Sequence, residues 1–284
     1  MTGRGTGRGK LILSGEHAVV YGYPAVAVAV DRGTTAHVTR INGALEVPGH
    51  SDPRLHRGIH ALTGDGWRVE LGGDLPIGRG MGSSAALAVA VARALADARG
   101  EQANDVYDQA MRAERVFHGN ASGLDVAVSA LGGAVWFERG TPPCIEPLPC
   151  PDLSLVVLDS GTAGDTAALV AGVAGRRPEV DTILDEIGAV AAQVRRALPD
   201  PATLGPLLTH NHALLRRIGV STDRLDHLVE VALGAGALGA KLAGAGGGGV
   251  VLALVDPSIG PHRILAAAAA LDIEALTATP WSSA

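Results

Sequence analysis

One glycine-rich segment reads Asp74-Leu-Pro-Ile-Gly-Arg-Gly-Met-Gly-Ser-Ser-Ala-Ala86 and continues into the apolar run Leu87-Ala-Val-Ala-Val-Ala-Arg-Ala-Leu-Ala96. Its three glycines occupy alternate positions, where the missing Cβ lets the backbone turn its N–H groups toward one point. The pair Ser83-Ser84 then opens a helix, whose free N–H groups and positive dipole end attract an anion. The segment therefore predicts a phosphate-binding loop; the alternative is a tight strand-to-helix turn that binds nothing.

Two other phosphate loops are excluded by spacing. A P-loop ends in Gly-Lys-Ser/Thr, and no lysine follows these glycines. A dinucleotide-binding fingerprint needs a second strand with an acidic residue about 20 positions further on. That region is still helical and reaches only Asp97 and Glu101.

Composition limits the class of protein. The 284 residues are 47% hydrophobic, which is enough for one large domain or two smaller ones around a cleft. Only 3% are aromatic and the formal charge is -6, so nucleic acid is not an expected partner. A small anionic substrate remains compatible, because it needs only two or three local cations.

Apolar runs, the N-terminal segment and the cysteines predict the cellular location and the redox state of the thiols. The apolar run at residues 23–30 is short and contains Pro24, and the basic N-terminus is too glycine-rich for a transit helix. We therefore expect a cytoplasmic protein with no membrane partner. Cys144 and Cys150 lie in a proline-rich segment and are interpreted as reduced loop thiols rather than a disulfide or a metal site.

Hydrophobic periodicity predicts mixed secondary structure. Strands are expected at residues 10–13, 18–30, 34–38, 43–47, 67–71, 134–137, 153–159 and 275–279. Within residues 239–254 we expect a second glycine loop followed by one strand. Helices are expected at residues 51–64, 83–99, 103–117, 165–174, 179–197, 203–218, 222–236 and 264–271. The proline-rich stretch 141–151 is predicted to be a linker between two domains.

Sparse charged and hydroxyl residues gather at the glycine-rich segments. Lys10 and Glu16-His17 flank the first, Ser83-Ser84 the second and Lys241 the third, while Asp125 lies in a polar turn of its own. A protein that needed only turns would have little reason for this pattern. It favours a phosphate-handling enzyme.

Three ordered motifs resemble those of the GHMP kinases. They are Gly9-Lys-Leu-Ile-Leu-Ser-Gly-Glu-His-Ala-Val-Val-Tyr-Gly22, Pro76-Ile-Gly-Arg-Gly-Met-Gly-Ser-Ser-Ala-Ala86 and Lys241-Leu-Ala-Gly-Ala-Gly-Gly-Gly-Gly249. Within that superfamily the first motif, together with Glu114-Arg-Val-Phe-His-Gly-Asn-Ala-Ser-Gly-Leu-Asp125, is most similar to the mevalonate kinases. The resemblance implies an α+β fold with an N-terminal domain (1–145) like ribosomal protein S5 domain 2 and a ferredoxin-like C-terminal domain (146–284).

The resemblance also implies roles for individual residues. The ATP-binding positions are Pro76, Ile77, Gly78, Arg79, Gly80, Met81, Gly82, Ser83, Ser84, Ala85 and Ala86. Ser84 and Glu114 are the expected Mg²⁺ ligands, and Asp125 is the expected base with Lys10 as its cationic neighbour. The expected substrate-binding positions are Glu16, His17, Gly244 and Ala245.

Each of these residues also has an ordinary structural interpretation. Asp125 could cap the segment at residues 126–130, and Glu114 could be a solvated charge on a helix face. His17 could be a turn residue, and Lys241 could lie on the surface. The pair His210/His212 is interpreted as a polar cluster at a helix start, because a zinc site needs a third ligand.

The expected function is ATP- and Mg²⁺-dependent phosphorylation of mevalonate to 5-phosphomevalonate in isoprenoid precursor synthesis. Its alternatives are a GHMP kinase for phosphomevalonate, a sugar or another small hydroxylated acid, and a non-catalytic ligand sensor of the same fold. Departures from the family pattern at Arg8, Gly73, Leu87 and Ala121 bear on which substrate is used. The sequence leaves the oligomeric state open, a homodimer included.

Overall fold

The computed structural model describes residues 1–76, 78–102, 104–119 and 121–282 of the chain. The first half forms β1 (Thr2–Ser14), a 3-10 helix (Ala18–Tyr21), β2 (Ala25–Arg40), α1 (Pro53–Thr63), β3 (Trp67–Gly73), α2 (Ser83–Arg99), α3 (Val106–His118), α4 (Leu124–Leu131), β4 (Ala134–Glu138) and β5 (Cys144–Leu148). The second half forms β6 (Leu155–Asp159), α5 (Thr166–Ala174), α6 (Asp181–Ala197), α7 (Pro201–Arg217), α8 (Asp223–Gly234), β7 (Gly239–Ala243), β8 (Val250–Leu254), α9 (His262–Ala269) and β9 (Ala275–Ala278). Runs of helices and antiparallel strands form separate layers, in agreement with the α+β prediction.

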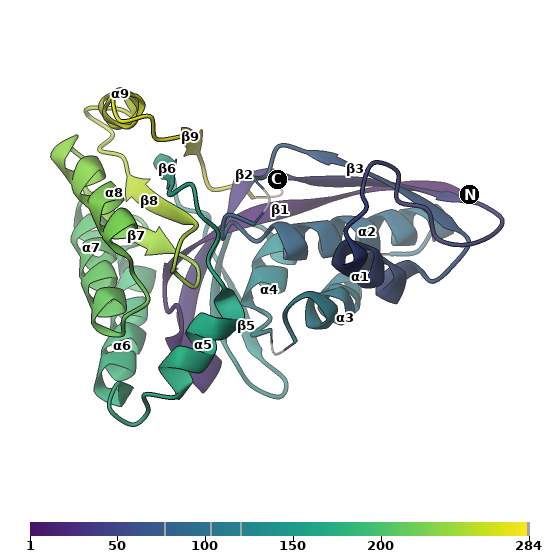
Figure 1. Ribbon diagram of the computed structural model, residues 1–284, viewed down its shortest axis with the longest axis horizontal. Coiled ribbons are helices and arrows are strands. Elements are labelled where there is room, and N and C mark those ends of the chain that lie inside the picture. The colour runs from purple at the N-terminus through teal and green to yellow at the C-terminus, as the bar shows by residue number, and fades with distance from the viewer. Residues whose placement is uncertain (77, 103, 120, 283–284) are drawn as a thin grey trace.

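The first sheet is built around β2. β1 pairs with one edge of this strand, while β4 and β3 share the other, beside residues 25–28 and 34–40 respectively. β5 extends the sheet beyond β4, and every pairing is antiparallel. Helices α1 to α4 gather on one side of this sheet (Figure 1).

Glycines allow α2 to lie directly on β1. Gly3, Gly5 and Gly7 alternate along the strand, and a Cβ at each would overlap the backbone of an alanine in α2. The helix is rich in alanine for the same reason, since small side chains on both surfaces permit the close approach. This contact fixes the start of α2 next to the strand that carries Lys10.

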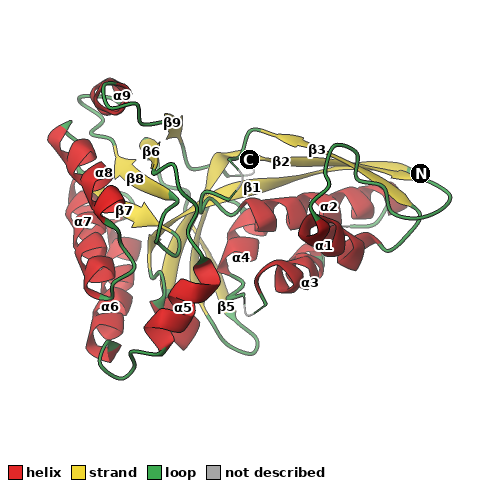
Figure 2. Ribbon diagram, in the orientation of Figure 1, coloured by secondary structure: helices red, strands yellow, loops and turns green. Residues whose placement is uncertain are grey.

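The second sheet has the order β7-β8-β6-β9 and is also antiparallel. Helices α6, α7 and α8 stand along its outer side, at the left of Figure 2. The C-terminal segment then returns to the first sheet, where Trp281 N–H donates to the Ala29 carbonyl and Gly133 N–H donates to the Trp281 carbonyl. The chain end therefore ties the two sheets together.

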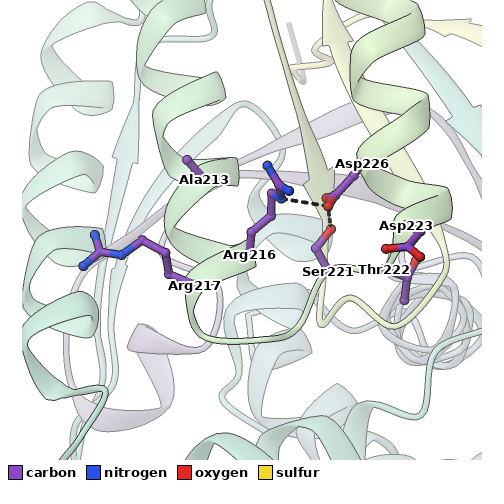
Figure 3. A pocket seen from close by; sticks show the side chains of 7 residues that line it. All are labelled: Ala213, Arg216, Arg217, Ser221, Thr222, Asp223 and Asp226. Carbon is purple, nitrogen blue, oxygen red and sulfur yellow. Dashed lines mark hydrogen bonds and ion pairs between the residues drawn. The ribbon is translucent and has the colours of Figure 1, made fainter.

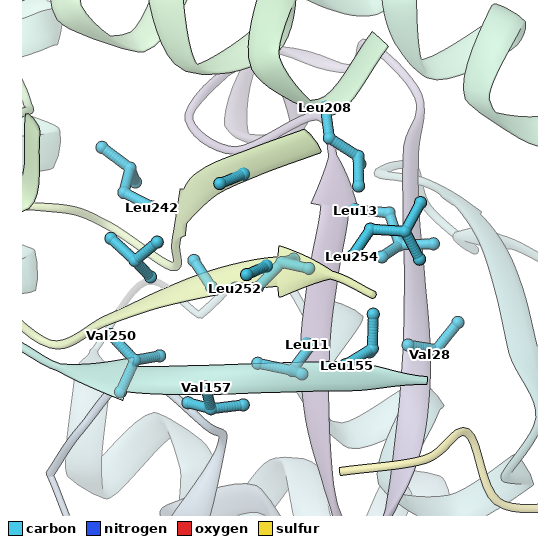
Figure 4. Packing of buried hydrophobic residues seen from close by; sticks show 14 of the residues in the cluster. Leu11, Leu13, Val28, Leu155, Val157, Leu208, Leu242, Val250, Leu252 and Leu254 are labelled. Atoms are coloured by element: carbon cyan, nitrogen blue, oxygen red, sulfur yellow. The ribbon is translucent and has the colours of Figure 1, made fainter. Parts of the chain in front are cut away.

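One apolar core joins the two halves. Leu11, Leu13 and Val28 from the first sheet pack with side chains of β6, β7 and β8 from the second (Figure 4). All of these positions are buried. Because the core crosses between the sheets, residues on β1 are held in a defined position against residues on β7.

Most predicted elements are confirmed, among them the helices at residues 51–64, 165–174, 179–197, 203–218 and 222–236 and the strands at 67–71, 153–159 and 275–279. Other predictions differ from the structure. The strand predicted at residues 18–30 begins only at Ala25, after the 3-10 helix Ala18–Tyr21, and continues through residues 34–38 as the single strand β2. The glycine-rich N-terminus, for which no element was predicted, belongs to β1. Residues 43–47 contain only an isolated bridge from Glu46 to Arg68, and Gly239–Ala243 is a strand in its own right.

The proline-rich stretch 141–151 was predicted as a linker, but its centre forms β5. Pro147 is tolerated there because β5 is an edge strand. The predicted domain boundary after residue 145 falls within β5 and stays a prediction. Cys144 and Cys150 are both free and exposed. In the described part of the chain no helix is long and apolar enough to cross a membrane.

Candidate active site

The glycine loop between β3 and α2 needs its glycines for their backbone angles. Gly78, Gly80 and Gly82 have φ values of 73°, 80° and 74°, in the left-handed region that residues with a Cβ avoid. Ile77, one of the expected ATP-binding positions, lies outside the described residues. Met81 is buried, and its carbonyl accepts a hydrogen bond from Lys10 N–H at 2.9 Å.

The first turn of α2 leaves donors free. Ala86 N–H donates to the Gly82 carbonyl, the first bond of the helix, so the N–H groups of the three preceding residues have no partner within it. Gly82 itself is the N-cap and offers no side chain to satisfy them. Ser83 Oγ instead accepts a bond from Gly78 N–H at 3.3 Å, which closes the loop. An anion would meet aligned donors at this end of α2.

Lys10 joins the loop to Asp125. Its Nζ donates to the Gly80 carbonyl at 3.0 Å and lies 3.2 Å from Asp125 Oδ2. Asp125 stands in the first turn of α4, whose N-cap is Gly123 in a left-handed conformation. The lysine is buried, whereas the aspartate side chain is about one-third exposed (32%). A charged pair therefore borders the phosphate loop, with its carboxylate open to a ligand.

Glu114 projects from α3 toward the start of α2. Its Oε1 accepts from Ser84 Oγ at 3.3 Å and lies 3.6 Å from His118 Nε2, while its buried Oε2 has no hydrogen-bond partner. Burial raises the pKa of Glu114 to about 8, and the negative charge of Asp125 adds to this effect. An unpaired buried carboxylate oxygen is uncommon, and one of this kind could accept a cation as a ligand.

A second glycine loop, between β7 and β8, touches the first. A Cβ on Gly80 would come within 3.0 Å of the Ala243 carbonyl. In the same loop the Ala245 carbonyl lies 2.8 Å from His17 Nε2. His17 adopts a left-handed φ of 61°, and burial lowers the pKa of its ring. Since a carbonyl only accepts, the imidazole proton lies on Nε2.

Glu16 and Lys241 form a buried ion pair with one another. Lys241 is therefore not on the surface, which overturns that alternative. Burial lowers the pKa of Lys241, and the negative charge of Glu16 raises it by a smaller amount. Asn211 Nδ2 donates to the other oxygen of Glu16 at 3.1 Å. Glu16 is thus occupied on both oxygens, unlike Glu114.

Several other residues lie differently from their sequence interpretation. His210 and His212 sit in the middle of α7 rather than at a helix start. His210 is exposed and contacts Glu186, whereas His212 is buried with Nε2 3.0 Å from Asp226 Oδ1. Their spacing of two residues puts them on different faces of the helix. Among the described residues no three His, Cys, Asp or Glu side chains gather as a metal site.

Sequence reasoning assigned no role to His118, which borders the loop, and did not foresee the ion pair of Arg79, an expected ATP-binding position. His118 Nε2 lies 3.0 Å from Ser84 Oγ, and its spacing of four from Glu114 on one helix was the available signal. Arg79 Nε lies 3.0 Å from Asp159 Oδ2 at the end of β6. That ion pair connects the first loop to the second sheet, and no local pattern in the sequence indicates it.

A pocket of about 500 Å³ lies between the end of α7 and the start of α8 (Figure 3). Asp226 accepts there from Arg216 and Ser221, and these contacts are drawn in the figure. The lining residues are Ala213, Arg216, Arg217, Ser221, Thr222, Asp223 and Asp226. None of them was among the predicted site residues.

Models of two protein families match the chain. The GHMP kinases N terminal domain matches residues 53–133, and the GHMP kinases C terminal domain matches residues 190–271. The chain belongs to the GHMP kinase family. Similar relatives of this GHMP kinase include the mevalonate kinases of Methanothermobacter thermautotrophicus and Thermococcus gammatolerans. They are 38% and 36% identical to it, over 86% of this chain and 87% and 86% of their own lengths.

Solved structures share the fold of this GHMP kinase. L. major mevalonate kinase in complex with R-mevalonate superposes with a TM-score of 0.86 at 29% identity, covering 100% of this chain and 98% of that one. Streptococcus pneumoniae phosphomevalonate kinase gives 0.82 at 17% identity, covering 99% of both chains. The second likeness concerns the fold alone. The predicted two-domain GHMP kinase fold is confirmed.

Proposed function

We propose that this GHMP kinase phosphorylates mevalonate, using ATP and Mg²⁺ to form 5-phosphomevalonate for isoprenoid precursor synthesis. The observation that carries the proposal is the bridge made by Lys10, which binds the phosphate loop through Gly80 and pairs with the open carboxylate of Asp125. Relatives named mevalonate kinase, 36–38% identical over 86% of the chain, support mevalonate as the acceptor.

The chain's own groups suit phosphoryl transfer. The free N–H groups at the start of α2 would hold the triphosphate, and Lys10 supplies positive charge beside the transferring group. Asp125 would orient the acceptor hydroxyl and take its proton. As the hydroxyl oxygen bonds to the γ-phosphorus, the bond from that phosphorus to the bridging oxygen breaks and ADP leaves.

Glu114 and Ser84 fit a magnesium ion. The buried Oε2 of Glu114 is unpaired, and the Ser84 hydroxyl lies beside the same carboxylate. Mg²⁺ prefers six oxygen ligands, usually few from protein, and phosphate oxygens and water would supply the others. When bound, the ion neutralises charge on the phosphates. Its ligation would also replace the proton that burial favours on Glu114.

His17, Gly244 and Ala245 are proposed to face the acceptor. The contact from the His17 ring to the Ala245 carbonyl brings the turn after β1 to the second glycine loop. His17 follows the strand that carries Lys10 and lies seven residues further along the chain. A homodimer and a cytoplasmic location stay predictions.

A coupled assay of ADP release tests the function. Mevalonate, phosphomevalonate, homoserine and galactose are offered separately with Mg²⁺ and ATP, and Asp125→Asn prepared in parallel reports contaminating kinase. We expect turnover of mevalonate well above the other three. Turnover of phosphomevalonate or galactose without mevalonate would overturn the proposed acceptor and leave the family assignment intact.

A further inference from the structure

A buried polar cluster lies where the two sheets meet, and it shares no hydrogen bond or ion pair with the Lys10–Asp125 pair among the contacts described. Its charged members are Glu16, in the turn after β1, and Lys241, on β7. Their side chains are 1% and 0% exposed. Charged groups are rarely buried to this extent unless they are paired, so the cluster needs a reason beyond filling space.

Every polar group of the cluster has a partner. Lys241 Nζ donates to Glu16, to the Ile12 carbonyl at 3.1 Å and to the Leu242 carbonyl at 2.6 Å. The second oxygen of Glu16 accepts from Asn211 Nδ2, whose Oδ1 in turn accepts from Ser14 Oγ at 3.0 Å. All donors of the ammonium group are used, and both carboxylate oxygens are occupied.

The cluster joins elements that are far apart in the sequence. Ile12 and Ser14 lie on β1, Asn211 lies on α7, and Lys241 lies on β7. Water does not reach it, since Ser14, Glu16, Asn211 and Lys241 are each at most 2% exposed. In this low-dielectric setting the contacts are strong and geometrically demanding.

Each charged residue is close to a proposed substrate position. Glu16 precedes His17, whose ring contacts the Ala245 carbonyl, and Lys241 stands four residues before Ala245. The ion pair therefore fixes the distance between the turn after β1 and the second glycine loop. Both oxygens of Glu16 accept from protein donors and its side chain is 1% exposed, so a substrate could contact it only by displacing these neighbours.

We propose that Glu16 and Lys241 are positioning residues: their ion pair clamps the turn at His17 to the glycine loop at residues 244–249, and Glu16 does not contact the substrate. The kinetic part of this inference rests on the proposed function. The structural part does not, because the pair and the loop exist without a substrate.

The test uses Glu16→Gln, Lys241→Met and the double variant in the full-length chain, with the exposed Arg68→Gln as control. Either single change leaves a buried charge without its partner and should lower the urea midpoint strongly. The double change removes both charges and should recover much of that midpoint. The control lies in an exposed pair with Glu46 and Glu70 and should change nothing.

Two readouts separate clamping from simple stability. Amide hydrogen exchange at residues 244–249 of the folded double variant should rise about tenfold, while exchange in α2 stays normal. The KM for mevalonate should rise about tenfold in each single variant and by the same factor in the double, with the KM for ATP unchanged. Asn211→Ala keeps the ion pair and should shift both readouts in the same direction by less; it serves if the double variant does not fold.

Three other outcomes would contradict the clamp or the function on which its kinetic part rests. Normal exchange and a normal KM in the double variant would make the pair a structural filler and overturn the clamp. Effects of Glu16→Gln and Lys241→Met on KM that multiply in the double variant would place Glu16 in contact with substrate. If the wild-type protein does not turn over mevalonate, the proposed function fails, and hydrogen exchange still decides the clamp.

Discussion

Two lysine–carboxylate pairs of this protein differ in how far water reaches them. Lys10 pairs with Asp125 beside the phosphate loop, where the carboxylate is about one-third exposed (32%). Lys241 pairs with Glu16 where the two sheets meet, and neither side chain reaches the surface. The same two chemical groups thus occur in an open and a closed setting.

The difference lies in what each carboxylate has left to offer. Both oxygens of Glu16 are held by protein donors, so the pair is complete. Asp125 shares its lysine with the Gly80 carbonyl and faces outward. Pairing inside the protein fixes geometry, whereas an open carboxylate can orient a ligand. Exposure and unoccupied oxygens, rather than residue type, separate a reacting pair from a positioning pair.

The largest expected effect comes from the open pair. Asp125→Asn keeps the shape of the side chain and removes its charge, so turnover should fall by roughly 10²- to 10⁴-fold, the range for a lost general base. Nucleotide affinity should change little, and added Mg²⁺ should not restore the rate. The measurement is the turnover rate at saturating ATP and mevalonate over a Mg²⁺ series, with the exposed Asp108→Asn as control. Near-normal turnover would remove Asp125 from the chemistry.

Glu114 sharpens the comparison, because it is buried like Glu16 but has an unpaired oxygen. Glu114→Gln should lower turnover at low Mg²⁺ by roughly 10- to 100-fold, the range for weakening a metal site. Part of the rate should return as Mg²⁺ is raised, since mass action refills a weakened site. The exposed Glu101→Gln is the matched control. If Mg²⁺ rescues Asp125→Asn and not Glu114→Gln, the two proposed roles are reversed.

The third expected effect is on stability alone and concerns the surroundings of the closed pair. His212 follows Asn211 on α7; its Nδ1 accepts from Leu242 N–H, and burial lowers its pKa to about 4. The unfolded chain binds a proton near pH 6.5, so this part of the stability is complete above pH 6.5 and is lost as pH falls toward 4. The loss should reach roughly 2 to 3 kcal/mol.

Urea unfolding between pH 4 and 8 measures this loss. His212→Gln should remove that part of the pH dependence, while the exposed His210→Gln should keep it. An identical pH slope in wild type and His212→Gln would mean that His212 is not held neutral in the folded protein. The surroundings of the closed pair would then be more open to water than the structure indicates.

Local sequence patterns predicted most of the fold. Apolar spacing predicted α6, α7 and α8, and alternating glycines before two serines predicted the loop and the start of α2. Elements whose contacts are distant in sequence were missed. No element was predicted for the glycine-rich N-terminus, because alternating glycines carry no apolar pattern, and contact with the alanines of α2 is what makes them suitable for a strand.

The sequence by itself determined the glycine loops, the residues placed beside them and the family to which they belong, because each motif is contiguous and depends on backbone angles and helix ends. Only the tertiary structure decided which charges are paired. Glu16 and Lys241 are 225 positions apart. No local periodicity predicts that the lysine on β7 is buried against the glutamate in the turn after β1. A buried ion pair is a property of the space between elements, where desolvation makes an unpaired charge costly, and that space exists only in the folded chain.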